Sequence, residues 1–360
     1  MRNPSNHAKL EKQTGLIYHP TCLKHDIPHH PERPARITAT MEYLKEKEML
    51  NRLSLIEAEP VRDEDLLRTH SEQLVSKVRE LSLSGGGYID ADTEVNSYTY
   101  EAARLAAGGA VKAAKLVMER TINNAFSLLR PPGHHANRDR AAGFCYFNNL
   151  AVMIKYLQAR HGLARILVLD WDAHAGNGTE EIFWSDPGVL VISLHQDPRF
   201  FYPGTGFIEE RGGGDGEGYT VNIPLPPGSG NGDYIYLLKE FVVPLARRYK
   251  PEFIAISSGT DSHRDDYISG LSLTEEGFGQ MSRQIVELAE AVCSGRMVVC
   301  LEGGYNLAAL SRSNYFIISA LLGELPEYGH GEEPKISTRQ LLNTLNNQAR
   351  WMNLVQPSSS

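Results

Sequence analysis

The chain has 360 residues, of which 41% are hydrophobic and 22% charged, which is the composition of a folded globular protein rather than a disordered or fibrous one. Its formal charge of −8 argues against nucleic acid as a partner, because nucleic-acid binding depends on neutralising phosphates with basic side chains. No stretch reaches the roughly 18 apolar residues of a membrane span, and the first residues lack the apolar centre of a secretory signal. We therefore expect a cytoplasmic protein with no membrane partner.

Short apolar runs alternate with helical patterns along the chain, which is typical of a parallel sheet with crossover helices. The predicted strands are 125–129, 166–169, 189–194, 253–257 and 297–301. The predicted helices are 98–120, 148–161, 233–249, 274–292, 307–322 and 337–352. Each strand carries apolar residues on both faces, as expected where helices cover both sides of a sheet. The pattern predicts an α/β fold of three layers, α/β/α, with a mainly parallel central sheet.

No repeat, low-complexity tract or long linker interrupts residues 15–330, which indicates one domain. We expect an N-terminal segment at 1–14, a single domain at 15–353 and a flexible tail at 354–360. The last residues, Gln356 to Ser360, have no apolar content to anchor them.

Polar residues follow four of the predicted strands. They are Arg130-Pro-Pro-Gly-His-His135, Asp170-Trp-Asp-Ala-His174, Ser258-Gly-Thr-Asp261 and Glu302-Gly-Gly-Tyr305. A single cluster of this kind is more often a helix cap or a solvated turn. Because ligands sit beyond the carboxyl ends of the strands in open parallel sheets, four clusters at one edge indicate a site.

Asp172 and His174 stand two residues apart, and alternating side chains of an extended segment point the same way. A carboxylate oxygen and an imidazole nitrogen suit zinc, and Asp261 is a candidate third ligand that would leave a position open for water. The alternative interpretation is a helix cap at Asp172 and a core histidine at 174.

Hydrolysis at zinc also needs a base, which His134 or His135 could supply. Adjacent histidines point to different places, so one would face the water while the other supports it. Asp170 and Asn177 are candidates to orient the ring nitrogens. Tyr305 follows two glycines that let it approach the metal and donate a hydrogen bond to a developing oxyanion, although simple packing at a strand end is the alternative.

Seven ordered motifs resemble the histone deacetylase superfamily, which has the arginase–deacetylase fold, and most closely its class II and bacterial or archaeal histone-deacetylase-like amidohydrolases. They span nearly the whole chain: His29-His-Pro-Glu-Arg-Pro34, Arg130-Pro-Pro-Gly-His-His-Ala136, Gly143-Phe-Cys-Tyr-Phe-Asn-Asn149, Asp170-Trp-Asp-Ala-His-Ala-Gly-Asn-Gly-Thr179, Phe201-Tyr-Pro-Gly-Thr-Gly206, Ser258-Gly-Thr-Asp261 and Leu301-Glu-Gly-Gly-Tyr-Asn306.

The resemblance implies one catalytic zinc ion, with its ligands at Asp172, His174 and Asp261. It implies His135 as the principal general base and acid, with His134 as its electrostatic partner, backed by Asp170. Tyr305 would polarise the acyl carbonyl.

The family also carries one or two structural potassium ions beside the zinc. The matching side chains here would be Asp170, Asp172 and Ser193, together with the backbone oxygens of His174 and Leu194.

For the substrate, the resemblance implies a narrow tunnel that takes an acyl-amine side chain. Gly143, Phe144 and Tyr202 match its walls. Asp92 matches the rim aspartate that holds a peptide's backbone, and Ile268 matches a rim position where animal polyamine deacetylases place a glutamate. An apolar residue at 268 weakens the polyamine interpretation.

Two further positions depart from the family pattern. Ala175 stands where most members have a second histidine, and Thr260 stands where many have phenylalanine. Neither residue is a predicted metal ligand, so we expect both to tune the activity rather than abolish it.

The sequence therefore predicts a zinc-dependent hydrolase of N-acyl-lysine, in a protein or peptide, or of a related acylated amine. The same site could instead serve an acetylpolyamine or another small amide. A two-metal ureohydrolase is disfavoured because position 175 offers no further ligand. A catalytically dead acyl-lysine-binding module is disfavoured because neither a ligand nor the tyrosine is lost.

Overall fold

The computed structural model describes residues 13–325 and 332–349. Its centre is an eight-stranded parallel sheet with the order β2-β1-β5-β10-β9-β6-β7-β8. The strands are β1 (Thr14–Tyr18), β2 (Ser54–Glu57), β5 (Asn124–Ser127), β6 (Ile166–Asp170), β7 (Val189–Gln196), β8 (Thr220–Leu225), β9 (Phe253–Ser258) and β10 (Met297–Leu301). A separate antiparallel pair joins β3 (Gly86–Tyr88) to β4 (Glu94–Asn96).

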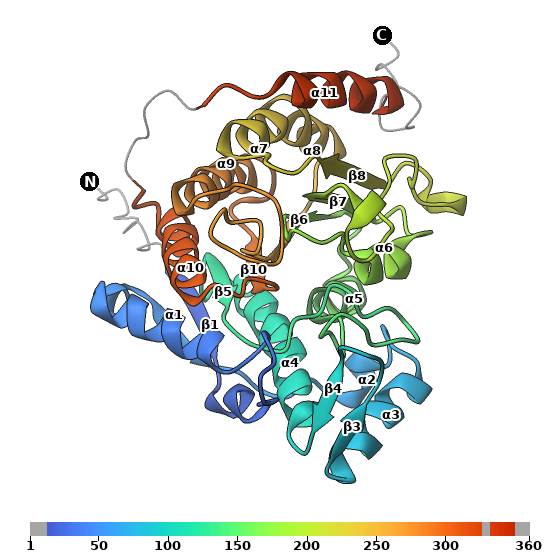
Figure 1. Ribbon diagram of the computed structural model, residues 1–360, viewed down its shortest axis with the longest axis vertical. Coiled ribbons are helices and arrows are strands. Elements are labelled where there is room, and N and C mark those ends of the chain that lie inside the picture. The colour runs from blue at the N-terminus through green and yellow to red at the C-terminus, as the bar shows by residue number, and fades with distance from the viewer. Residues whose placement is uncertain (1–12, 326–331, 350–360) are drawn as a thin grey trace, which may run out of the picture.

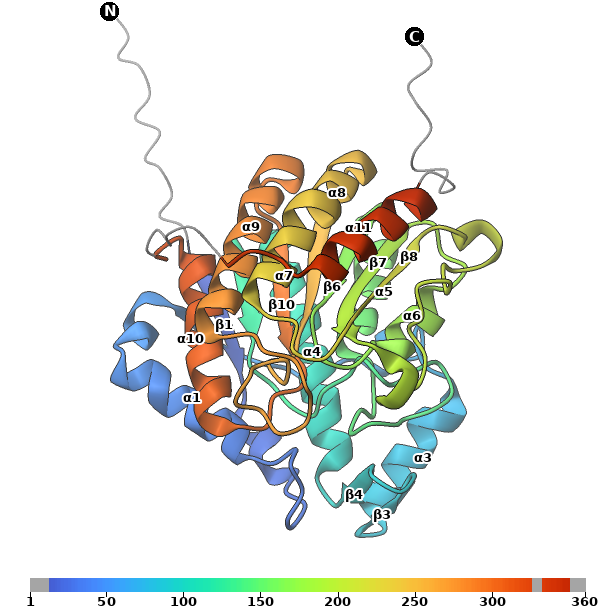
Figure 2. The same ribbon diagram turned by 45° about the horizontal axis from the view of Figure 1, so that its top comes forward.

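Helices cover both faces of this sheet. They are α1 (Ala35–Glu46), α2 (Asp63–Leu66), α3 (Glu72–Leu83), α4 (Thr99–Met118), α5 (Asn149–His161), α6 (Asn177–Phe183), α7 (Asn231–Leu237), α8 (Val243–Tyr249), α9 (Glu275–Cys293), α10 (Leu307–Leu322) and α11 (Ile336–Ala349). α4 and α5 pack on one face and α9 and α10 on the other, with α1 beside α10 and α7 beside α9 (Figures 1 and 2). The predicted three-layer α/β/α fold is confirmed.

The central strands form because most of their residues are apolar, with polar residues only at strand ends. Every residue of β5, β6, β9 and β10 is buried, as strands covered by helices on both sides require. The strand predicted at 297–301 and the helix predicted at 307–322 match β10 and α10 residue for residue. The other predicted strands and the helices predicted at 98–120, 148–161 and 274–292 differ from the observed elements by one or two residues at an end.

The helix predicted at 233–249 is wrong as a single element. The segment begins with α7, passes through a π-helical turn at Leu238–Val242 and continues as α8. Pro244, the second residue of α8, has no N–H to donate to a carbonyl in the preceding turn, and this interrupts the regular hydrogen-bond pattern.

At the two ends, the predicted boundaries of the domain stay predictions. Residues 1–12 of the predicted N-terminal segment lie outside the described residues, as do 350–352 of the predicted last helix and the whole predicted tail at 354–360. Within the parts that are described, no helix is both long enough and apolar enough to cross a membrane.

The strand order gathers the four polar segments at one place. β5, β10, β9 and β6 are consecutive neighbours in the sheet, and each of them leads into one of the four segments. Because the strands are parallel, the four segments lie side by side at the carboxyl edge.

Candidate metal centre and hydrolytic site

The side chains of Asp172, His174 and Asp261 converge beyond the ends of β6 and β9. His174 Nδ1 lies 3.0 Å from Asp172 Oδ1 and 3.1 Å from Asp261 Oδ2. Among the residues that the structure describes, these three form the one group of at least three His, Cys, Asp or Glu side chains whose ligand atoms lie within 4.8 Å of one another. The structure thus brings together the three predicted zinc ligands.

The donor set fits a cation. Asp261 is fully buried, and its Oδ2, which lies 3.1 Å from His174 Nδ1 as an ion-pair contact, has no hydrogen-bond partner among the described residues. Burial and the neighbouring Asp172 raise the pKa of Asp261 to about 6. Gly303 leaves room at this point, because a Cβ there would lie 2.3 Å from Asp261 Oδ2. Two close carboxylates and one imidazole form a ligand set that suits zinc.

The two histidines of the 130–135 segment have different partners. His134 Nδ1 lies 3.0 Å from Asp170 Oδ2, and His135 Nδ1 lies 2.7 Å from Asn177 Oδ1. The sequence named Asp170 and Asn177 as candidate partners, and the structure gives one to each histidine. An N–H on His135 Nδ1 donates to the Asn177 oxygen, and this leaves His135 Nε2 free to accept a proton.

The same surroundings move the pKa values of the two histidines in opposite directions. Burial lowers the pKa of His134, but Asp172 and Asp170 outweigh it and hold that pKa well above its usual value. Burial and the neighbouring His134 and His174 hold the pKa of His135 well below its usual value. His135 is therefore neutral and able to act as a base beside a positively charged His134.

Tyr305 lines the same cavity as His134, His135 and His174, and contacts to its backbone and to its ring hold it in position. Asp266 Oδ2 accepts hydrogen bonds from the backbone N–H groups of Tyr305 at 2.6 Å and Asn306 at 2.9 Å. The guanidinium carbon of Arg36 lies 5.0 Å from the centre of the Tyr305 ring. Burial raises the pKa of Tyr305 well above its usual value, so the hydroxyl remains protonated and can donate.

A cavity of about 160 Å³, called here the central cavity, opens above these groups. Its lining is Asp92, Pro132, His134, His135, Gly143, Phe144, His174, Tyr202, Ile268, Gly303 and Tyr305. All five predicted substrate-binding residues belong to it. Gly143 is required, because a Cβ there would lie 2.5 Å from His135 Cδ2.

Aromatic rings support the metal side of this cavity. The Phe201 ring stacks on His174 with the ring centres 4.5 Å apart, and the Tyr202 ring meets His135 edge-on at 4.9 Å. The sequence did not single out Phe201 as a site residue, although it stands within a quoted motif.

Two of the predicted potassium ligands, Asp170 and Ser193, lie on neighbouring strands. Asp170 and Ser193 are partners in the pairing of β6 with β7, so their side chains lie next to each other. The Ser193 hydroxyl lies 2.7 Å from His195 Nδ1, and His195 Nε2 lies 2.8 Å from the carbonyl of Gly206.

The two departures from the family pattern lie close to the site without lining the cavity. Ala175 is buried, and its Cβ would be 2.6 Å from a Cβ added to Gly206. The Thr260 hydroxyl is buried and has no hydrogen-bond partner among the described residues.

Sequence reasoning missed a second cluster of charge. Glu32 Oε1 accepts hydrogen bonds from Arg36 Nη1 at 3.0 Å and from Arg130 Nε at 2.7 Å, and all three side chains are fully buried. Glu32 and Arg36 stand four residues apart, but Glu32 precedes α1, so the helical i,i+4 pattern gives no signal for this pair.

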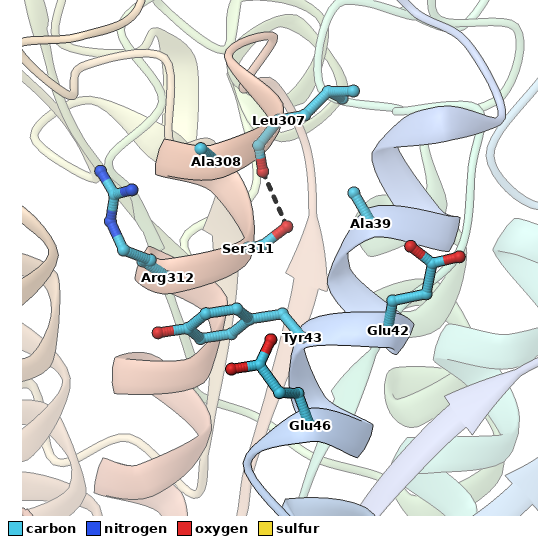
Figure 3. Close-up of a pocket in the computed structure, with 8 residues that line it drawn as sticks. All are labelled: Ala39, Glu42, Tyr43, Glu46, Leu307, Ala308, Ser311 and Arg312. Carbon is cyan, nitrogen blue, oxygen red and sulfur yellow. Dashed lines mark hydrogen bonds between the residues drawn. The ribbon is translucent and has the colours of Figure 1, made fainter.

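A groove of about 280 Å³ between α1 and α10 is a different kind of hollow. Figure 3 shows Glu42 and Glu46 on the α1 side and Arg312 on the α10 side. Arg312 Nε already donates to Glu275 at 2.7 Å, and the Ser311 hydroxyl donates to the carbonyl of Leu307. Arg312 and Ser311 are thus both paired within the protein.

Comparisons with known proteins agree with this geometry. Residues 30–321 match the model of the histone deacetylase domain family. The chain is 47% identical over 314 residues to a probable deacetylase of Archaeoglobus fulgidus, with 86% of each chain covered. It is 40% identical over 332 residues to a histone deacetylase-like amidohydrolase of Pseudomonas aeruginosa, with 87% of each covered. The crystal structure of the HDA15 HD domain matches with a TM-score of 0.88 at 36% identity, covering 95% of each chain.

Proposed function

The chain belongs to the histone deacetylase family, and we propose that it is a zinc-dependent hydrolase of N-acyl-lysine side chains or closely related acylated amines. One observation carries the proposal. Asp172 and Asp261 converge on His174, which lines the central cavity together with His135 and Tyr305, and an oxygen of Asp261 has no hydrogen-bond partner among the described residues.

Zinc would be held by Asp172 Oδ1, His174 Nδ1 and Asp261 Oδ2. When bound, it supplies Lewis acidity, which makes water a stronger acid and the acyl carbonyl a better electrophile.

The residues around the metal site would transfer the protons and stabilise the charges that develop during hydrolysis. His135, neutral and oriented by Asn177, accepts a proton from water at Nε2 and later returns it to the leaving amine. His134, held by Asp170, keeps positive charge next to His135. Tyr305 keeps its proton and donates a hydrogen bond to the acyl oxygen as negative charge develops there.

We also propose that potassium occupies the space between Asp170, Asp172 and Ser193, with the backbone oxygens of His174 and Leu194. The pairing of Asp170 with Ser193 supports this assignment. A cation there would stabilise the segment after β6 that carries two of the zinc ligands, Asp172 and His174.

The shape of the central cavity supports a substrate with an unbranched apolar stem. Phe144 and Tyr202 flank it, and rings on both sides suit the methylenes of a lysine side chain. Asp92, which lines the cavity, would accept hydrogen bonds from the backbone of a peptide substrate. The apolar Ile268 disfavours a cationic amine near it. An acetylpolyamine or another small amide is therefore only the second candidate substrate. The observation in its favour is Asp92, an acidic group in the lining that could attract a cation. The cytoplasmic location stays a prediction.

The test uses the purified full chain loaded with one equivalent of zinc. We expect release of free amine from acetyl-lysine peptides, faster than from acetylpolyamines and small amides. Inactivity towards all three classes with zinc bound would reject the proposal.

The Tyr305→Phe variant separates a hydrolase from a binding module. We expect kcat to fall by on the order of 100- to 1000-fold with KM little changed, because the hydroxyl acts on the developing oxyanion. Equal turnover by the variant and the wild type would favour the binding module.

A further inference from the structure

Glu302 is a fully buried carboxylate immediately after β10, and the mechanism above gives it no role. Its Oε2 accepts hydrogen bonds from the backbone N–H groups of Gly133 at 2.7 Å and His134 at 3.1 Å. Its Oε1 accepts one from the Ser257 hydroxyl at 3.3 Å. Its backbone carbonyl accepts one from Arg36 Nη2. The side chain of Glu302 thus reaches directly to the turn that carries both histidines.

The same residue is also tied to the other two parts of the site. It stands three residues before Tyr305 in the chain. The next residue, Gly303, donates its backbone N–H to Asp172 Oδ2 at 2.8 Å. A single segment therefore connects the histidine turn, the metal triad and the tyrosine.

Burying a carboxylate is unfavourable unless it is hydrogen-bonded, and burial raises the pKa of Glu302 to about 7. The cost is offset by three donors, two of which belong to the backbone of the histidine turn. Because both N–H groups donate to the same oxygen, Glu302 holds the backbone of the turn at two consecutive residues, Gly133 and His134. A small displacement of a catalytic group can lower the rate about 100-fold, so such fixing matters for rate.

We propose that Glu302 is a positioning residue that holds the His134–His135 turn at a fixed distance from Tyr305 and the metal triad. The inference rests on the proposed hydrolase function, and it adds a residue outside both the lining of the central cavity and the metal triad.

Three substitutions separate the reach of the side chain from its charge. In Glu302→Gln, an amide oxygen in the place of Oε2 can accept from both N–H groups while the NH₂ group faces Ser257, so kcat should stay within about threefold of wild type. Glu302→Asp keeps the charge but is one methylene shorter, and Glu302→Ala removes the acceptor. For both we expect kcat to fall on the order of 100-fold with KM unchanged.

Asp233 provides the matched control. It is also a buried carboxylate that accepts from two backbone N–H groups, those of Gly230 at 3.0 Å and Lys335 at 2.8 Å. None of these residues lines the central cavity. Asp233→Ala should lower the melting temperature and leave kcat at the wild-type value.

The experiment measures kcat, KM, melting temperature and zinc content of the full-length variants with an acetyl-lysine peptide. Rescue by Glu302→Gln together with loss in Glu302→Asp would support positioning, even if Glu302→Ala fails to fold. Wild-type kcat in Glu302→Asp would overturn the proposal, as would a loss in Glu302→Gln as deep as in Glu302→Asp. Inactivity of the zinc-loaded wild type would instead reject the proposed function.

Discussion

Glu32 and Asp261 are both fully buried carboxylates close to Tyr305, yet their surroundings differ in one respect. Glu32 is hydrogen-bonded by Arg36 and Arg130, which supply its countercharge from within the protein. Asp261 lies next to a second carboxylate, Asp172, and its Oδ2 has no hydrogen-bond partner among the described residues. The first cluster is neutralised by two arginines, whereas the basic group beside Asp261 is His174, itself one of the three proposed metal ligands.

The pKa values express the same difference. Burial raises the pKa of Glu32, but Arg130 and Arg36 outweigh it and bring the value down to about 2. For Asp261, burial and Asp172 act in the same direction and raise the pKa to about 6. Equal burial therefore has opposite outcomes for the two pKa values, because two arginines contact Glu32 whereas a second carboxylate lies beside Asp261.

Asp261→Asn gives the largest expected effect. The amide keeps an oxygen for the backbone N–H of Ala173 but removes the charged ligand, so zinc binding should be lost. We expect kcat/KM to fall at least ~1000-fold, as loss of several kcal/mol of transition-state stabilisation implies. The metal-free variant should be at least as stable as the metal-free wild type, because one of two repelling carboxylates is gone. If this variant kept both its zinc and its turnover, Asp261 would not be a required zinc ligand, and the contrast with the Glu32 cluster would fail.

Glu32→Gln should act on stability. It leaves Arg36 and Arg130 buried without a countercharge, and breaking such a buried pair costs about 3–5 kcal/mol. Denaturant unfolding of the metal-free proteins at pH 7 measures this cost, and zinc content by metal analysis serves as the control. A free energy of unfolding equal to that of the wild type would mean that the ion pairs of Glu32 with Arg36 and Arg130 do not stabilise the fold.

The pH dependence of that cost follows from the pKa of Glu32. Since the folded value of about 2 lies below the ordinary value of 4.5, the contribution is fully present above pH 4.5 and is lost as the pH falls towards 2. The stability difference between wild type and Glu32→Gln should be constant from pH 5 to 7 and shrink below that range. A difference that stays constant down to the lowest pH at which both proteins fold would contradict this account.

Thr260→Val should give the smallest effect. Like Asp261 Oδ2, its hydroxyl is buried and has no hydrogen-bond partner in the described part of the chain, but it is uncharged. Replacing an unsatisfied hydroxyl with a methyl group should leave the free energy of unfolding within about 1 kcal/mol of wild type, with zinc content unchanged. A larger loss, measured by denaturant unfolding, would show that the hydroxyl has a partner.

The sequence predicted the metal cluster because its residues follow apolar strands directly and parallel strands end at one edge. It did not predict the Glu32 cluster, because Arg130 lies 98 residues away and only the fold brings it to Glu32. The role of Glu302 was missed for the same reason, although the residue stands in a quoted segment.

The fold was predictable where apolar runs were long. β6, β9 and β10 are continuous runs, whereas β1 begins with Thr14 and Gly15, and β8 contains Asn222 and Pro224. Among the strands that the structure describes, β8 pairs only with β7, at the end of the sheet, where a proline is tolerated. Whether such segments form strands depends on pairing with their neighbours in the sheet rather than on their own sequence pattern.

The most direct test of the central claim is a zinc titration of the metal-free protein, with amine release from an acetyl-lysine peptide as the readout. We expect no turnover without metal, a rise in turnover with added zinc and saturation at one zinc per chain. Full turnover in the metal-free protein, or saturation only at two metals per chain, would contradict a single zinc ion held by Asp172, His174 and Asp261.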